Sequence, residues 1–135
     1  MTIQEIPCYV ARGGTSKGVF IDESALPEPG PERDLIILKL MGSPDIRQID
    51  GLGGGDPLTS KVAIISPSSE PGCDINYLSA EVRLNKMEVN YGIMCGNLAS
   101  AVALVAGDLG YVSLPELEGV VNIHNRNSGK QIGVK

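Results

Sequence analysis

Apolar and polar side chains alternate most clearly between residues 77 and 84. Ser79, Glu81 and Arg83 fall on one face of this segment, and the apolar side chains between them fall on the other. This alternation predicts a half-buried strand over Tyr77–Leu84, because successive strand residues point to opposite faces. Shorter apolar runs predict further strands at Ile6–Ala11, Gly18–Ile21, Lys61–Ile65, Met87–Val89, Val120–His124 and Gln131–Val134.

Two other segments have helical patterns. The first is Arg33–Met41, which Gly42 ends. Its expected core contacts are Leu35, Ile36, Leu38 and Leu40. The second is Asn97–Gly107, where apolar side chains cover almost the whole helical circumference and Asn97 is a suitable N-cap. A helix that is apolar all round is typical of a buried position.

Two segments predict loops. Arg12–Lys17 separates two predicted strands and indicates a hairpin with an extended tip. Gly42–Ser60 has almost no periodicity, and such a long loop in a compact domain is usually functional or disordered. Strands around one central buried helix predict an α+β fold with a mixed or antiparallel sheet, and the length fits a single domain over residues 1–135.

Charge and composition exclude several classes of protein. The 11 Lys and Arg residues against 16 Asp and Glu give a net charge of −5, which argues against binding to nucleic acid or to an anionic membrane. The three cysteines are odd in number and lack a CxxC motif, so neither a disulfide scaffold nor a structural zinc site is expected. The first ten residues lack a signal-peptide pattern, and a cytoplasmic location is the expectation.

Cys95 directly precedes the predicted buried helix. Unpaired N–H groups and the positive end of the helix dipole favour a thiolate at such a position and can hold a carboxylate. Gly96 removes a side chain and permits close approach of a ligand. The simpler alternative is a buried structural cysteine before an Asn N-cap, and the residues alone leave both interpretations open.

Glycine-rich segments carry the other candidates. The hairpin tip Arg12–Gly18 combines glycines, hydroxyls and cations, so it is either an anion-binding nest or an ordinary flexible hairpin. Three consecutive glycines, Gly53–Gly55, indicate that something approaches the backbone there or that the segment moves. Lys61 then opens a predicted strand, where it is either a general base or a solvated lysine. His124 lies in a predicted strand and is expected to be a surface or hydrogen-bonded histidine rather than a catalytic one.

Four segments are long enough to compare with known families. They read CYVARGGTSKG from Cys8, MGSPD from Met41, RQIDGLGGGDPLTSK from Arg47, and CGN from Cys95. In this order they resemble the 2-methylaconitate cis–trans isomerase (PrpF-like) family, whose relatives include methylitaconate and oxalomesaconate isomerases. The resemblance runs from residue 7 to residue 135.

The resemblance implies a fold similar to that of diaminopimelate epimerase, with two pseudo-symmetric halves that each curl a sheet around a central helix. This chain would be the N-terminal half, without the C-terminal half that completes the active-site cleft. The family resemblance also implies proton transfer without a cofactor or metal, acting on small unsaturated di- or tricarboxylic acids. It further implies a place in propionate metabolism and allows a homodimer.

The resemblance assigns roles to individual residues. Lys61 would be the base, Ser16 would relay a proton or hold a carboxylate, and Cys95 corresponds to the epimerase thiol. The residues expected to bind substrate carboxylates are Arg12, Gly13, Gly14, Thr15, Ser60, Gly96 and Asn97. The cations of the glycine-rich loops suit a polyanionic ligand even though the whole chain is acidic.

Two alternatives to a 2-methylaconitate-type isomerase stay open at this point. One is a tautomerase or epimerase of another carboxylic acid, of the 4-oxalomesaconate or methylitaconate type. The other is a catalytically inactive fragment that binds a carboxylate or nothing.

Overall fold

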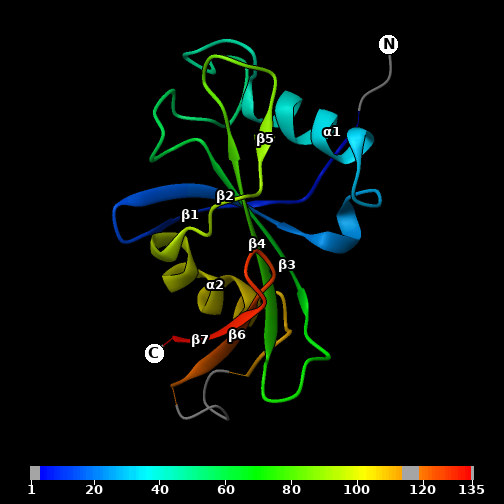
Figure 1. Ribbon diagram of the computed structural model, residues 1–135, viewed down its shortest axis with the longest axis vertical. Coiled ribbons are helices and arrows are strands. Elements are labelled where there is room, and N and C mark those ends of the chain that lie inside the picture. The colour runs from blue at the N-terminus through cyan, green and yellow to red at the C-terminus, as the bar shows by residue number, and fades with distance from the viewer. Residues whose placement is uncertain (1–3, 114–118, 135) are drawn as a thin grey trace.

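The computed structural model describes residues 4–113 and 119–134. Its elements follow one another as β1 (Tyr9–Gly13), β2 (Ser16–Asp22), the short 3-10 helix η1 (Glu23–Ala25), α1 (Pro31–Met41), β3 (Lys61–Pro67), β4 (Ile75–Val82), β5 (Val89–Asn90), α2 (Gly96–Asp108), β6 (Val121–Asn125) and β7 (Lys130–Val134). The α+β class predicted from the sequence is confirmed. Figure 1 shows α1 and α2 towards opposite ends of the long strands β3 and β4.

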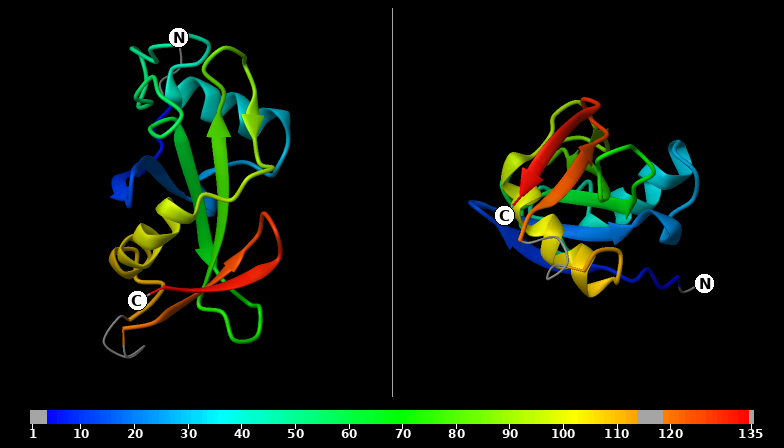
Figure 2. Two further views of the ribbon diagram at one scale, coloured as in Figure 1. Left: turned by 60° about the vertical axis from the view of Figure 1, so that its left-hand side comes forward. Right: turned by 90° about the horizontal axis from the view of Figure 1, so that it is seen from below.

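The strands of the described residues form one mixed sheet. Its order is β1-β2-β3-β4-β6-β7, and β5 pairs with β4. β2 and β3 are parallel, as are β4 and β6, whereas the other neighbours are antiparallel. The sheet is strongly twisted, and the β6–β7 hairpin lies across the long strands on the side where α2 packs (Figure 2).

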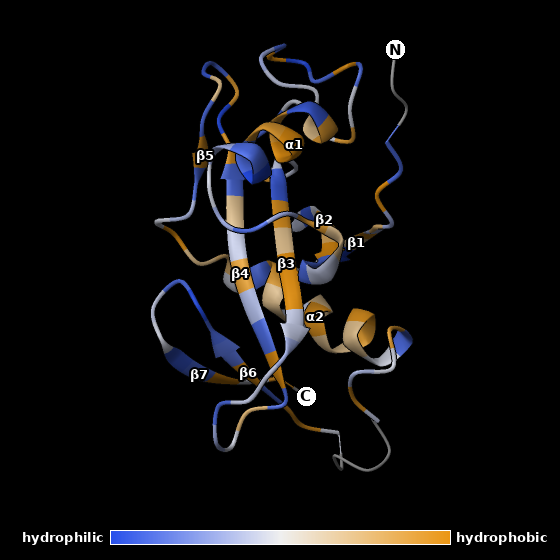
Figure 3. Ribbon diagram, turned by 90° about the vertical axis from the view of Figure 1, so that its right-hand side faces the viewer, coloured by the Kyte–Doolittle hydropathy of each residue, from blue (hydrophilic) through white to orange (hydrophobic). Residues whose placement is uncertain are grey.

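The sheet has a hydrophobic core on each face, which corrects the prediction of strands around a single helix. On one face Phe20, Ala63 and Tyr77 pack with α2. On the other face Val19 and Val62 belong to the cluster that contains the buried side of α1. Because both faces of β3 are covered, that strand is apolar along most of its length (Figure 3).

Covering both faces also changes the environment of β4. The sequence predicted a half-buried strand extending to Leu84, but β4 ends at Val82, and Tyr77 and Ser79 are buried as well as Ala80. The alternation of residue types predicts that one face of the strand is exposed to solvent. Instead both faces are covered, one by α2 and the other by the cluster that contains α1.

The two helices occupy the predicted segments, with different buried faces. In α1 the buried residues are Arg33, Ile37, Leu38 and Met41, whereas Leu35 is 43% exposed. Two of the four predicted contacts are confirmed, since Leu38 is buried and Leu40 packs against the same cluster. The predictions for Leu35 and Ile36 were wrong, and the sequence pattern did not predict that Arg33 is buried. In α2 nearly all apolar residues are buried as predicted, although Leu104 is 68% exposed.

Candidate functional site

The three predicted catalytic side chains meet at one place. The Nζ atom of Lys61 lies 3.3 Å from Sγ of Cys95, and that sulfur lies 3.7 Å from Oγ of Ser16. Ser16 and Cys95 are buried, and Lys61 is partly exposed. The cluster therefore combines an amine, a thiol and a hydroxyl, which are groups that can accept, donate or pass on a proton.

Strand geometry explains how Ser16 and Lys61 come together. Each is the first residue of its strand, and β2 and β3 are parallel with Gly18 opposite Lys61. Alternate residues of a strand share a face, and Phe20 and Ala63 pack against α2. Ser16 and Lys61 consequently point from the same sheet edge towards the start of α2.

Cys95 is held at that helix start by several contacts. It is the N-cap of α2, and its Sγ accepts a hydrogen bond from the backbone N–H of Leu98 at 3.4 Å. The predicted cap, Asn97, lies inside the helix instead. The hydroxyl of Tyr77 donates to the carbonyl oxygen of Cys95 at 2.9 Å, and burial raises the pKa of Tyr77 well above its ordinary value.

The first hairpin packs its tip against the same helix start. β1 and β2 reach Gly13 and Ser16, so only Gly14 and Thr15 remain between them and the predicted extended tip is wrong. A Cβ atom on Gly13 would lie 2.1 Å from the carbonyl oxygen of Asn97. The Nδ2 of Asn97 donates to the hydroxyl of Thr15 at 3.0 Å. The tip is thus docked on α2, because glycine allows two backbones to approach closely.

The remaining predicted binding residues divide into two groups. Arg12 in β1 and Gly96 at the start of α2 are exposed. A Cβ on Gly96 would have no neighbour within 4 Å. Ser60 is fully buried, and its hydroxyl donates to the carbonyl of Val82 at 2.7 Å and accepts from Gln48 at 2.7 Å. The structure therefore does not bring the Ser60 hydroxyl to the thiol.

Side chains of the long loop 42–60 itself explain why Gly53 and Gly54 carry no side chain. A Cβ on Gly53 would lie 2.0 Å from Oε1 of Gln48, and one on Gly54 would lie 2.2 Å from Oγ1 of Thr59. Sequence reasoning gave Gln48 no role. The glycines Gly53–Gly55 indicated that some group approaches the backbone there. The sequence did not show that this group is a side chain of the same loop rather than a ligand.

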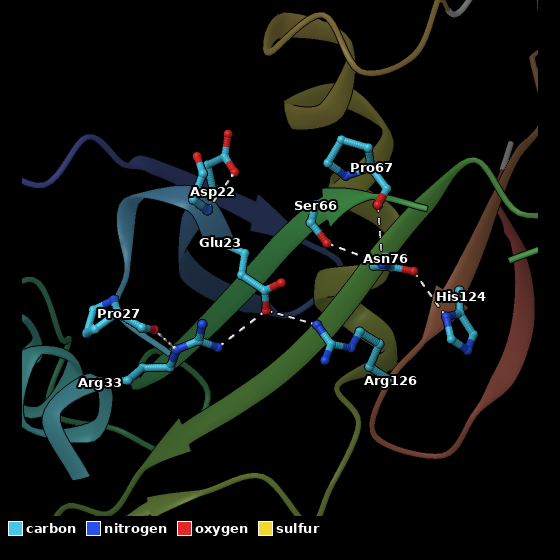
Figure 4. A network of polar contacts seen from close by, with 10 residues as sticks. Asp22, Glu23, Pro27, Arg33, Ser66, Pro67, Asn76, His124 and Arg126 are labelled. Carbon is cyan, nitrogen blue, oxygen red and sulfur yellow. Dashed lines mark hydrogen bonds and ion pairs between the residues drawn. The ribbon is translucent and has the colours of Figure 1, made fainter. Parts of the chain in front are cut away.

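A second polar cluster lies at the opposite ends of β2 and β3, as Figure 4 shows. One carboxylate oxygen of Glu23 lies 3.3 Å from the buried Arg33 and 2.9 Å from Arg126. His124 forms a hydrogen bond with Asn76 at 3.0 Å, which agrees with the expectation of a satisfied histidine. A cavity of about 510 Å³ borders Glu23 and both arginines, and Asp22 and Glu28 also line it, so the arginine charges there are offset by carboxylates.

The described residues contain neither a membrane-spanning helix nor a cluster of metal-ligating side chains. None of the helices there has the length and apolar character needed to cross a membrane. Within residues 4–113 and 119–134, no group of His, Cys, Asp and Glu side chains is arranged to hold a metal ion.

The amine and the thiol at the start of α2 are side-chain types that can serve in general acid–base catalysis. The chain belongs to the PrpF protein family, whose model matches residues 3–135. This confirms the resemblance noted in the sequence.

Relatives that are named for an activity match most of this chain. It is 48% identical over 125 residues to a 3-methylitaconate isomerase of Eubacterium barkeri, covering 93% of this chain and 33% of that protein. It is 47% identical to a 4-oxalomesaconate tautomerase of Pseudomonas putida, covering 93% of this chain and 35% of the relative. A 2-methyl-aconitate isomerase of Cupriavidus necator is 41% identical, with coverages of 95% and 35%.

A solved structure extends the similarity to the fold. The crystal structure of a methylitaconate-delta-isomerase matches with a TM-score of 0.90 and 47% sequence identity, over 95% of this chain and 33% of the other. The chain therefore spans about a third of the length of the relatives it matches.

Proposed function

We propose that this chain is the N-terminal part of an isomerase that moves a proton within small unsaturated di- or tricarboxylic acids. The observation that carries the proposal is the 3.3 Å contact between the Lys61 amine and the Cys95 thiol at the start of α2. The names of the relatives support the class of reaction, since they are isomerases and a tautomerase of methylitaconate, methylaconitate and oxalomesaconate.

The proposed reaction begins when a base takes a proton from a carbon next to the conjugated system. Lys61 is the proposed base, because its residue is partly exposed and its amine contacts the Cys95 thiol, which in turn contacts the Ser16 hydroxyl. The electron pair delocalises into the double bond and carboxylate. The same proton or another then returns to a different carbon, or to the same carbon after bond rotation. Atoms and electrons balance without a redox step, so the proposal requires no cofactor.

Substrate carboxylates are proposed to bind at the helix start and hairpin tip. Gly96 and Asn97 lie in the first turn of α2, where backbone N–H groups and the helix dipole favour an anion. The open space at Gly96 leaves room for such a group. Arg12 and Thr15 are exposed on the neighbouring hairpin, and Arg12 donates to the carbonyl of Gly14 at 3.0 Å.

The larger architecture is part of the same proposal. A second half of similar fold, as in diaminopimelate epimerase, would close the site over the exposed face of Gly96 and Asn97. The fact that the chain spans about a third of its relatives supports an incomplete site. A cytoplasmic location, a place in propionate metabolism and a homodimer stay predictions.

The test is proton exchange in D₂O with the full-length protein that contains this chain. Methylitaconate, 2-methylaconitate and 4-oxalomesaconate are each incubated with the protein, and NMR follows loss of the carbon-bound hydrogen while ultraviolet absorbance follows isomerisation. We expect at least one acid to exchange and isomerise, and the isolated 135 residues to turn over little of it. Absence of exchange with all three acids contradicts the proposed function, and full activity of the isolated chain contradicts the incomplete site.

A further inference from the structure

Gln48 is a buried polar residue at the centre of the long loop. Its side chain is 1% exposed, while its apolar neighbours Ile46 and Ile49 are 61% and 60% exposed. This is the reverse of the usual preference, in which polar side chains face water. Burial of an amide is unfavourable unless its hydrogen bonds are made inside the protein.

Both ends of the Gln48 amide have partners. Nε2 donates to the hydroxyl of Ser60 at 2.7 Å, and Oε1 accepts from the backbone N–H of Gly55 at 3.0 Å. The Ser60 hydroxyl in turn donates to the carbonyl of Val82 at 2.7 Å. A continuous chain of hydrogen bonds thus runs from the glycine run, through Gln48, to the end of β4.

This network of hydrogen bonds is connected to the proposed catalytic cluster through the backbone. Ser60 directly precedes Lys61, and its carbonyl accepts from the N–H of Val82 at 3.0 Å. The carbonyl of Leu58 accepts at 3.0 Å from the N–H of Lys17, the residue after Ser16. The end of the loop is therefore hydrogen-bonded to β2, which carries Ser16, and to β4, and it continues directly into Lys61 at the start of β3.

The backbone around Gln48 shows that its side chain is accommodated at a cost. Gln48 has a φ of 53°, a left-handed conformation that is uncommon for residues other than glycine. Gly53 cannot carry a side chain, because a Cβ there would lie 2.0 Å from Oε1 of Gln48. Both features are explained if the segment is built around this amide.

We propose that Gln48 is a positioning residue, which holds the Lys61 amine beside Cys95 through Ser60 and the segment 53–59. The role of Lys61 as a base rests on the proposed function, whereas the hydrogen bonds around Gln48 do not depend on it. Because a displacement of about 1 Å can lower a rate about 10²-fold, a residue outside the cluster can control turnover.

The test replaces Gln48 by methionine in the full-length protein. Q48M has a similar length and lacks both hydrogen-bonding groups. We expect kcat to fall at least about 10-fold with KM within about twofold, because the amine is displaced while the carboxylate site is not. We also expect the pH dependence of kcat to shift, since the amine no longer lies beside the sulfur. A smaller folded fraction would instead lower kcat by the same factor at every pH and leave the shape of the pH profile unchanged.

Two further variants complete the experiment. Q131M is the matched control, because the Gln131 amide is exposed and bonds only the carbonyl of Gly72 in the described residues, and it should leave kcat and the pH profile unchanged. S60A interrupts the same hydrogen-bond chain with little change in volume. If Q48M does not fold, S60A carries the test, with the same expected loss and shift.

A crystal structure of each variant separates this inference from the proposed function. We expect the distance between Nζ of Lys61 and Sγ of Cys95 to increase from 3.3 Å in Q48M or S60A. An increase together with no isomerase activity in the wild type supports the positioning and contradicts the proposed function. An unchanged distance, or wild-type kcat and pH profile in an active protein, overturns the positioning alone.

Discussion

The amine of Lys61 lies 3.3 Å from the sulfur of Cys95, although the two residues are 34 positions apart in the chain. The parallel pairing of β2 and β3 sets the direction of Lys61, and the packing of α2 on the same face brings Cys95 to it. Neither residue is placed by its immediate neighbours in sequence alone.

Loss of the Lys61 amine should reduce turnover strongly. In the full-length protein, Lys61→Met keeps the length of the side chain but removes the base, and we expect kcat to fall by about 10²–10⁴. The measurement is the rate of isomerisation of whichever acid the wild type converts. Lys86→Met is the matched control, because Lys86 is exposed in the turn between β4 and β5. Near-normal turnover of the Lys61 variant would transfer the base role to Cys95 or Ser16.

Substitutions of Cys95 should separate its structural role from its chemical one. Cys95→Ala removes the group that caps α2, and we expect the free energy of unfolding to fall by about 1 kcal/mol. Cys95→Ser restores a cap, so its stability should match the wild type while kcat falls. Urea denaturation and steady-state kinetics measure the two effects, with Cys73→Ser as the control. Equal kcat in Cys95→Ser and the wild type would leave the cysteine a cap only.

Two glycines next to the site should respond differently to alanine. At Gly13 a Cβ would meet the Asn97 carbonyl oxygen at 2.1 Å, so Gly13→Ala should lower the free energy of unfolding by about 1–3 kcal/mol. At Gly96 there is open space, and Gly96→Ala should keep the stability or raise it by up to about 1 kcal/mol. If a substrate carboxylate fills that space, KM rises in Gly96→Ala. An unchanged KM would contradict binding at Gly96.

Alkaline pH should destabilise the fold through Tyr77, which is buried, and Tyr91, which is partly buried. Burial raises the pKa of Tyr77 and Tyr91 above the ordinary value of 10.0, and the hydrogen bond to Asp34 raises that of Tyr91 further. Above that pH the unfolded chain loses phenolic protons that the folded chain keeps. The free energy of unfolding therefore falls as the pH rises, by about 1.4 kcal/mol per pH unit for each such group.

Urea denaturation at increasing pH measures this alkaline loss. Tyr77→Phe should lower the stability at neutral pH, because the hydrogen bond to the Cys95 carbonyl is lost. It should also reduce the slope of stability against pH above 10.0 by the share of one tyrosine. The same alkaline slope in Tyr77→Phe and the wild type would contradict the raised pKa.

Local patterns were sufficient to predict most of the elements. The apolar run after Cys95, the β-branched run after Lys61 and the glycine after Met41 place a helix, a strand and a helix end correctly. The candidate site was also predictable as a set of residues. Lys61, Ser16 and Cys95 were chosen from motifs, and the structure brings them together.

Other features were not predictable because they depend on partners distant in the sequence. Arg33 is buried because Glu23 pairs with it, so the helical pattern of α1 was misinterpreted. Gln48 is buried because Ser60 and Gly55 satisfy its amide. A polar residue gives no local sign that its hydrogen bonds will be made inside the protein.

The sequence alone determined which segments become strands and helices, since that choice follows the period of apolar residues and the positions of glycine and proline. It also determined which reactive groups are available. Only the tertiary structure decided that both sheet faces are covered, that the glycine run encloses Gln48, and that amine and thiol meet. The physical reason is that strand pairing and helix packing join distant residues, and these contacts fix burial and distance.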